Sequence, residues 1–200
     1  FLAMQYPSEI PGITNAEFLR AAMNAGKEDE EKISVRDFIM KLDEKMELLN
    51  MKEEMAERYL NEGFSGGENK RNEIVQMEML RPSLAMLYEI DSGLDVDAMH
   101  IVANAINNLR AETGMSLMIV SHYDRFFELI EPQYTHVLVD GKVVLEGDGQ
   151  LARKIDTDGY DWIYAEYGIE VPCEKKAAHR PASTIGSCAV RNAAEAEAKK

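Results

Sequence analysis

The stretch Ser65-Gly66-Gly67-Glu68 combines residue types that suit the binding of a phosphate group. Ser65 and Glu68 stand in the Ser-x-x-Glu arrangement of a helix capping box, and the two glycines let another group approach the backbone closely. The residues that follow repeat apolar side chains on one helical face, at Ile74, Val75, Met77 and Leu80. The glycines therefore open a predicted helix, whose N-terminus offers free N–H groups and a positive dipole end to an anion. Considered by itself, such a stretch is more often only a helix cap.

Residues capable of chemistry also follow three apolar segments that are predicted to be strands. They are Gln5 after Phe1 to Met4, Glu89 and the sequence Ser92-Gly93-Leu94-Asp95 after Leu84 to Leu87, and His122 after Met115 to Val120. Buried-type strands that alternate with helices are typical of a parallel α/β sheet, which carries polar residues at the carboxyl ends of its strands. We therefore predict an α/β fold with a mostly parallel sheet.

The region between Gln5 and the glycine stretch is predicted to form a helical subdomain. Its expected elements are a loop at Ile10-Pro11-Gly12, a helix capped by Asn15 that ends near Ala25, a solvated linker from Lys27 to Lys32, a helix that begins at Ser34, and a short helix around Met55 to Leu60. The helix from Ser34 carries apolar residues at helical spacing, namely Phe38, Ile39, Leu42, Met46 and Leu49.

Further along the chain, helical and strand patterns continue and then fade. We expect helices from about Val96 to Arg110 and from Tyr123 to Ile130, and a hairpin of Thr135 to Val139 with Lys142 to Leu145. Beyond Pro172, alanine, lysine, glutamate and serine dominate and the aromatic residues vanish, so this tail is predicted to be mostly disordered.

Composition narrows the classes of partner. The formal net charge of −14 argues against nucleic acid or an anionic membrane as the main partner, because both require a basic surface. No apolar run reaches the length of a membrane span, and no secretory signal pattern is present. Cys173 and Cys188 have no metal-binding spacing, so reduced thiols in the cytoplasm are expected.

Taken in their order, the four motifs resemble the second part of an ATP-binding cassette ATPase. The resemblance implies that Gln5 is the Q-loop glutamine, Ser65 to Glu68 the signature loop, Glu89 the catalytic carboxylate after the Walker B strand, Ser92 to Asp95 the D-loop, and His122 the switch histidine. The chain begins at the Q-loop, as if inside a domain. The implied regions are 1–13 for the Q-loop end of the ATPase core, 14–63 for the helical subdomain, 64–171 for the rest of the core and 172–200 for the tail.

The detailed resemblance is to the SufC family, the ATPase subunits of SUF iron–sulfur cluster assembly. It covers about Phe1 to Gly168 and includes the segments Phe1 to Gly12, Asn61 to Glu73, Glu89 to Ala98, His122-Tyr123 and the hairpin Val137 to Val143. Transporter ATPases usually carry Leu-Ser-Gly-Gly-Gln where this chain has Phe64 followed by Ser-Gly-Gly-Glu.

This resemblance implies an activity, a site and partners. The substrate is ATP with Mg²⁺, and Glu89 and His122 are the implied catalytic residues, with Glu89 acting on the attacking water. Gln5 approaches the metal and the water, the signature loop contacts the phosphates, and Ser92 and Asp95 lie at the seam of an ATP-dependent homodimer. SufB/SufD-like scaffold proteins are the implied partners, with neither nucleic acid nor membrane.

Two departures from the family pattern limit what the chain is expected to do alone. No Gly-x-x-x-x-Gly-Lys-[Ser/Thr] loop occurs in the sequence, which is explained by either a fragment or a true truncation. Tyr88 stands where the family has a metal-associated aspartate, and its phenol is neutral at pH 7. A helix terminus contributes roughly 0.3–1 kcal/mol toward an anion, whereas micromolar binding needs about 8 kcal/mol. We therefore expect the isolated chain to be inactive, to need partners and to be poorly soluble.

Two other functions compete with this interpretation. The first is a degenerate cassette domain that binds partners without hydrolysing ATP, which Tyr88 favours. The second is the nucleotide-binding subunit of a transporter, which the Phe-Ser-Gly-Gly-Glu loop disfavours.

Overall fold

The computed structural model describes residues 1–121, 124–139, 141–160, 162–163 and 166. The chain divides into two compact units, Phe1–Thr157 and Asp158–Lys200. The helices and strands described below belong to the first unit, except for the last residue of the last helix. Most of the predicted tail, including Cys173 and Cys188, lies outside the described residues, and the limits of the four predicted regions stay a prediction.

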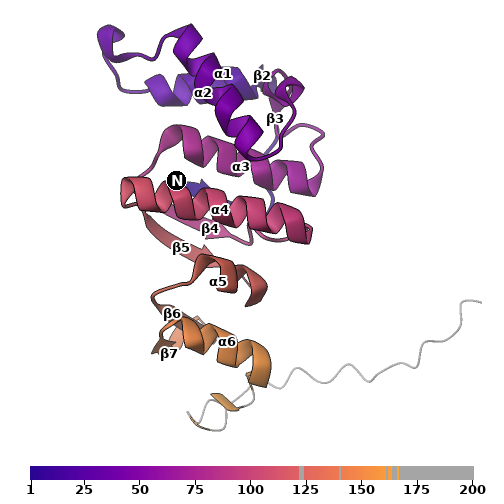
Figure 1. Cartoon of the computed structure of the whole chain (residues 1–200), viewed down its shortest axis with the longest axis vertical. Coiled ribbons are helices and arrows are strands. Elements are labelled where there is room, and N and C mark those ends of the chain that lie inside the picture. Colours follow the sequence, from indigo (N-terminus) through magenta and orange to yellow (C-terminus); the bar gives the residue numbers. More distant parts are fainter. Residues whose placement is uncertain (122–123, 140, 161, 164–165, 167–200) are drawn as a thin grey trace, which may run out of the picture. The chain divides into compact units, whose positions relative to one another are not determined.

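A three-stranded parallel sheet forms the centre of this unit. Its strands are β1 (Leu2–Ala3), β4 (Leu84–Tyr88) and β5 (Ser116–Val120), in the order β1-β4-β5. Both pairings are parallel, as the alternation of strands and helices predicts. Figure 1 shows helices α3 (Gly66–Leu80) and α4 (Val96–Thr113) lying across these strands. The predicted mostly parallel α/β fold is confirmed.

Helix α3 is buried along most of its length. It begins with the predicted capping box, in which Ser65 and Glu68 each bond the other's backbone N–H. Every residue from 72 to 79 is buried, whether polar or apolar, whereas the sequence pattern predicts a single buried face. The helix ends at Arg81, which adopts the left-handed conformation with a φ of 46°.

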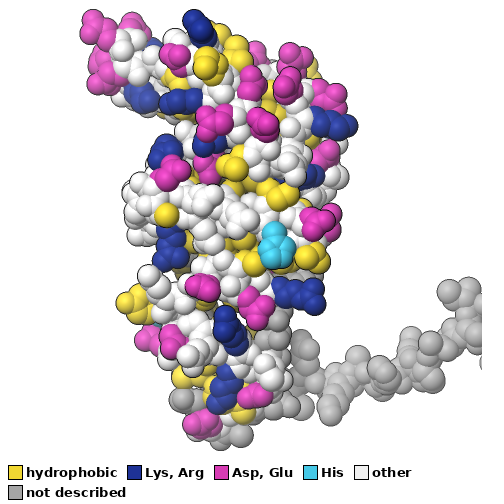
Figure 2. Space-filling model, in the orientation of Figure 1, with side chains coloured by type: hydrophobic (Ala, Val, Ile, Leu, Met, Phe, Trp, Pro, Cys, Tyr) yellow, Lys and Arg dark blue, Asp and Glu magenta, His cyan; other side chains and the backbone are white. Residues whose placement is uncertain are grey.

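The helical subdomain contains a small antiparallel sheet that the sequence pattern does not predict. Its elements are β2 (Ile10–Thr14), α1 (Asn15–Asn24), η1 (Asp29–Glu31), α2 (Val35–Leu48), η2 (Glu53–Ala56) and β3 (Tyr59–Leu60). Helix α2 begins where predicted, with Ser34 as its cap. The apolar residues Phe38, Leu42, Met46 and Leu49 are buried, but Ile39 is 50% exposed. Figure 2 shows acidic side chains gathered over α1, α2 and the segment between them.

Three local predictions in this subdomain are wrong. The loop expected at residues 10–12 is strand β2, and the helix expected from Met55 to Leu60 is a short 3-10 turn followed by β3, because pairing of Ile10 with Leu60 takes up their backbone groups. Asn15 does not cap α1. Thr14 does so in a capping box with Glu17, while Asn15 is buried and donates to the carbonyl of Met55.

Of the remaining elements, the short helix and the hairpin were predicted, whereas the last helix, Gly149–Asp158, was not. These elements are α5 (Asp124–Ile130), β6 (Thr135–Val139), β7 (Lys142–Gly147) and α6 (Gly149–Asp158). Strands β6 and β7 pair as an antiparallel hairpin with a register shift between Val137 and Leu138. Tyr123, the predicted start of α5, lies outside the described residues. Among the described residues, no helix is long and apolar enough to cross a membrane.

One face of the parallel sheet is covered by the core and the other is open. Side chains on β4 alternate strictly, with Ala85 and Leu87 buried on the covered face. Large apolar side chains lie exposed on the open face and its margin: Leu2, Met4, Leu84, Met86, Tyr88, Met118 and Val120. Exposed apolar patches often mark surfaces that bind another protein, so the finding agrees with the expected need for a partner.

Replacing Met118 by Lys tests this open face. Met118 is 57% exposed, so a charge there should reduce dye binding by the apolar surface and self-association of the chain. We expect the free energy of unfolding to change by less than about 0.5 kcal/mol. Leu87→Ala, on the covered face, should instead cost about 2–5 kcal/mol. Unchanged self-association of the Met118→Lys variant in analytical ultracentrifugation would contradict the prediction.

Candidate functional site

The register of the parallel strands brings two predicted site residues together. Ala3 lies opposite Leu87, so Gln5 and Glu89, each two residues further on, leave the sheet side by side. The side-chain Nε2 of Gln5 donates a hydrogen bond to Oε2 of Glu89. The backbone N–H of Glu89 donates to the carbonyl of Val120 at 2.8 Å, which holds the backbone of Glu89 in place at the carboxyl end of β4. His122, predicted to join them, lies outside the described residues.

Glu89 holds an unusual backbone conformation. Its φ is 48°, in the left-handed region that a residue with a long side chain seldom adopts. The next residue, Ile90, is completely buried and anchors the turn. The turn closes through hydrogen bonds from Ser92 N to Glu89 O and from Leu94 N to Asp91 O, both at 3.2 Å. Such local strain persists only where the surroundings enforce it, which is common at functional sites.

Asp91 is a buried carboxylate that the sequence analysis missed. It is 2% exposed, and the hydroxyl of Ser121 donates to its Oδ2 at 2.6 Å. Among the described residues its Oδ1 has no hydrogen-bond partner. In the sequence Asp91 looks like one more acid of a solvated turn, and only the pairing of β4 with β5 brings Ser121 to it.

The predicted signature loop forms the exposed start of α3. Ser65 and Gly66 are exposed, and the hydrogen bonds from Ser65 lower the pKa of Glu68 below its usual range. Gly67 lies beside the predicted D-loop, since a Cβ there would come within 3.9 Å of the carbonyl oxygen of Gly93 and 3.8 Å of a Leu94 methyl carbon. The chain therefore places two predicted motifs next to one another.

The glycine at position 66 is not required by the packing of the described residues. A Cβ built on Gly66 meets no atom within 4 Å, and its φ is not positive. Alanine in a helix is ordinarily favoured over glycine by roughly 0.5–1 kcal/mol. Close approach by a group from outside the chain would explain the glycine, whereas the fold alone does not.

Ser92 and Asp95 occupy the turn between β4 and α4. Asp95 is exposed and caps α4, since its Oδ1 accepts from the N–H of Ala98 at 2.7 Å. Asp95 is therefore the N-cap of α4. A role of either residue at a dimer seam stays a prediction.

Lys70 and Glu73 form a buried pair beneath Gln5, and neither was singled out from the sequence. Lys70 Nζ lies 3.9 Å from Glu73 Oε2, and the two side chains are 3% and 6% exposed. Burial lowers the pKa of Lys70 and raises the pKa of Glu73 to about 7. The sequence signal that could have identified them is a pair of opposite charges at positions i and i+3 of a helix that carries apolar residues further on.

Tyr88 occupies the position at which the family has an aspartate associated with Mg²⁺. It ends β4, is 41% exposed and lies on the open face of the sheet. A phenol is a poor ligand for a hard cation. Among the described residues there is no cluster of three or more His, Cys, Asp or Glu side chains that could hold a metal ion. The described residues therefore do not form a Mg²⁺ site by themselves.

Comparisons with known proteins identify the chain as a member of the family of ATP-binding cassette ATPases. The chain is 64% identical over 170 residues to a protein named "Probable ABC transporter ATP-binding protein" from Streptococcus pyogenes serotype M3, and 56% identical over 170 residues to "Vegetative protein 296" of Bacillus subtilis. It is 44% identical to "Probable ATP-dependent transporter ycf16" of Pyropia yezoensis. These alignments span 85%, 85% and 82% of this chain, but only 66%, 65% and 65% of the relatives. No family model matches.

Solved structures with the same fold are cassettes of ABC transporters. The dimeric structure of MJ0796, a bacterial ABC transporter cassette, superposes with a TM-score of 0.61 at 19% identity, covering 73% of this chain and 62% of that one. A post-hydrolysis structure of MJ0796 bound to ADP and Pi gives the same score over 74% of this chain and 62% of that one. An ATP-binding subunit of an ABC transporter also scores 0.61, at 22% identity, covering 84% of this chain and 68% of that one. The predicted cassette type of α/β fold is confirmed.

The raised pKa of Glu73 predicts a pH dependence of stability. The folded chain keeps a proton on Glu73 up to about pH 7, whereas the unfolded chain releases it near the ordinary pKa of 4.5. As the pH rises through this window, the contribution of Glu73 to the free energy of unfolding should fall by at most about 3 kcal/mol.

Glu73→Gln removes this contribution, so its stability relative to the native chain should rise between pH 5 and pH 8 in urea titrations. Glu68→Gln is the control, because the lowered pKa of Glu68 confines the change in its contribution to pH values below its ordinary pKa of 4.5, so the stability of this variant relative to the native chain should stay constant between pH 5 and pH 8. A stability difference between native and Glu73→Gln chains that does not change with pH would disprove the assignment.

Proposed function

Because the chain belongs to the family of ATP-binding cassette ATPases, we propose that it supplies the signature-loop half of a composite ATP site in a SufC-like ATPase. The observation that carries the proposal is the exposed start of α3. There Ser65 and Gly66 are exposed, a Cβ on Gly66 would meet no atom within 4 Å, and a helix N-terminus is favourable for an anion. Phosphates of a nucleotide held mainly by a second subunit would approach these groups.

The Gln5–Glu89 pair supports a role in hydrolysis. Glu89 stands at the carboxyl end of a parallel strand, with its backbone tied to Val120 and its side chain bonded by Gln5. A carboxylate held in this way can orient or deprotonate a water molecule that attacks the terminal phosphate of ATP. The Gln5 amide sets the direction of the carboxylate. We propose His122 as the residue that contacts the terminal phosphate, and Ser92 and Asp95 as residues of the dimer seam.

The sequence of the signature loop suggests the cellular process in which the ATPase acts. Phe64 followed by Ser-Gly-Gly-Glu resembles SufC rather than transporter ATPases, so we propose that the protein drives iron–sulfur cluster assembly. SufB/SufD-like scaffold proteins in the cytoplasm are the proposed partners, and a homodimer is the proposed ATP-bound state. The open face of the parallel sheet supports partner dependence.

Two alternatives each have one observation in their favour. The names of the relatives favour a nucleotide-binding subunit of a transporter. Tyr88, at the end of β4, favours a cassette that binds partners without hydrolysing ATP. Co-purification with a membrane permease would support the first alternative. Binding to a scaffold protein that does not depend on ATP would support the second.

Ser65 can be tested against Ser34, because the two residues cap helices in the same way. Each side chain accepts the backbone N–H three residues on, at 3.3 Å for Ser65 and 3.1 Å for Ser34. Replacing either by Ala should cost about 1 kcal/mol of stability. With ATP, we expect the chain to associate with the Streptococcus pyogenes relative in sedimentation velocity. Ser65→Ala should weaken that association at least about tenfold, or about 1.4 kcal/mol, and Ser34→Ala should leave it intact. Equal effects of the two substitutions would reduce Ser65 to a helix cap.

A chimera tests the hydrolytic residues. The chain is joined to the part of the same relative that lies outside the matched region, and phosphate release is measured. Tyr88→Asp should raise turnover, since a carboxylate suits Mg²⁺ and a phenol does not. Adding Glu89→Gln should then lower turnover by about 10²–10⁴-fold while ATP binding persists. If the chimera that retains Tyr88 binds ATP but never turns over, the non-hydrolysing alternative is correct for this chain.

A further inference from the structure

The buried pair Lys70 and Glu73 makes three hydrogen bonds to the backbone that carries Gln5. Lys70 Nζ donates to the carbonyl of Met4 at 2.9 Å and to the carbonyl of Gln5 at 2.7 Å. Glu73 Oε1 accepts from the N–H of Met4 at 3.0 Å. Three polar groups of two successive residues are thus bound by two side chains of α3.

These bonds replace sheet pairing that the segment lacks. Strand β1 pairs with β4 only at Leu2 and Ala3, so the polar groups of Met4 and Gln5 have left the ladder. A backbone group that is removed from water without a partner is costly, and here side chains of α3 supply the partners. Lys70 and Glu73 are themselves almost fully buried, which strengthens their hydrogen bonds by excluding water.

We propose that Lys70 and Glu73 are positioning residues that hold the Met4–Gln5 backbone so that the Gln5 amide points at Glu89. The proposal rests on the function proposed above, because it assigns Glu89 to the reaction. It also connects two motifs, since Lys70 lies on the second turn of the helix whose first turn is the signature loop. A displacement of the start of α3 would move the Gln5 backbone with it.

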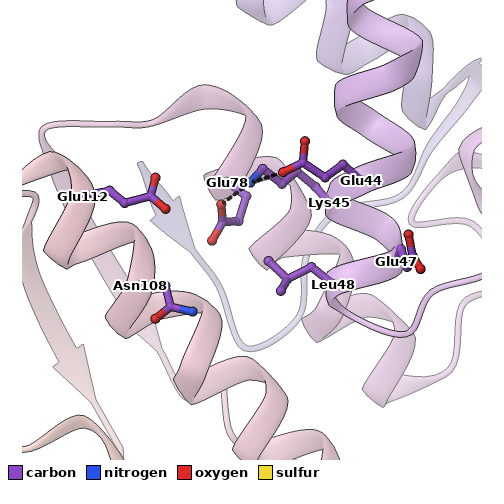
Figure 3. A pocket seen from close by; sticks show the side chains of 7 residues that line it. All are labelled: Glu44, Lys45, Glu47, Leu48, Glu78, Asn108 and Glu112. Atoms are coloured by element: carbon purple, nitrogen blue, oxygen red, sulfur yellow. Dashed lines mark hydrogen bonds and ion pairs between the residues drawn. The ribbon is translucent and has the colours of Figure 1, made fainter.

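An ion pair between a second buried carboxylate of α3 and a lysine of α2 provides the control. Near the opposite end of α3, Glu78 is 4% exposed and lies 3.4 Å from Nζ of Lys45 on α2. Figure 3 shows Lys45 between Glu44 and Glu78 in a pocket that Glu112 and Asn108 of α4 also line. Breaking this pair also leaves a buried carboxylate of α3 without its cation, but it touches neither Met4 nor Gln5.

The experiment observes Gln5 directly and needs no nucleotide. The full chain contains four glutamines, Gln5, Gln76, Gln133 and Gln150, so ¹⁵N-glutamine labelling gives four side-chain amide signals in an NMR spectrum. Gln5→Glu identifies the signal of Gln5. In the native chain its amide protons should be shifted downfield by the charge-assisted bond to Glu89. Gln76, 9% exposed on α3, reports whether the helix remains packed.

We expect Lys70→Met to move the Gln5 signal to the position of exposed glutamines while the Gln76 signal stays in place. Lys45→Met should leave the Gln5 signal unchanged. Glu73→Gln keeps an acceptor for the Met4 N–H and should preserve the Gln5 signal, whereas Glu73→Leu should lose it. This second pair of variants decides the question if Lys70→Met does not fold.

Opposite results overturn the positioning role. A native-like Gln5 signal in Lys70→Met or in Glu73→Leu, or an equal shift in Lys45→Met, would show that the buried pair acts only on stability. Failure of the proposed function would be recognised separately, because the Gln5 signal reports geometry whether or not ATP is ever hydrolysed.

Discussion

The amide of Asn72 on α3 binds two other buried asparagines, and the placement of the helical subdomain depends on this contact. Its Nδ2 donates to the side-chain oxygens of Asn15 at 2.9 Å and Asn61 at 3.1 Å. Asn61 in turn donates to the carbonyl of Ser8 at 2.9 Å. Leaving one such buried group unpaired costs about 1–3 kcal/mol, so the network allows few alternative positions. It fixes α1 and β3 against the helix that carries the signature loop.

The first turn of α3 and the part of the helix that follows it favour different charge states. At its exposed start, the glutamate of the capping box has a lowered pKa because backbone and side-chain donors of Ser65 stabilise its charge. One turn further, burial favours the neutral forms of both Lys70 and Glu73. The helix thus combines a solvated surface suited to an anion with a dry interior that fixes the neighbouring loop. The Gln5–Glu89 pair lies beside that interior, so the proposed phosphate contact at the start of α3 and the geometry of Glu89 depend on one helix.

Features set by local sequence were predictable, and features set by long-range pairing were not. The capping box at Ser65, the start of a helix at Ser34 and the parallel pairing of the strands follow from short patterns, and the structure has all three. Asn15 looked like a helix cap because its partner Asn72 lies 57 residues away. Lys70 and Glu73 looked like surface charges for the same reason, since Met4 and Gln5 are distant in sequence. The predicted roles of the site residues rest on family resemblance rather than on these patterns.

The parallel pairing of β1 with β4 has a consequence for the order of folding. The hydrogen bond from Phe1 to Leu84 closes a loop of 83 residues, and such closure is entropically unfavourable before the chain between them is organised. The bond from Asn61 to Ser8 and the pairing of β2 with β3 close the intervening subdomain on itself, which shortens the effective loop. Gln5 therefore meets Glu89 only after the subdomain has formed, and that pair should be among the first to open in native-state fluctuations.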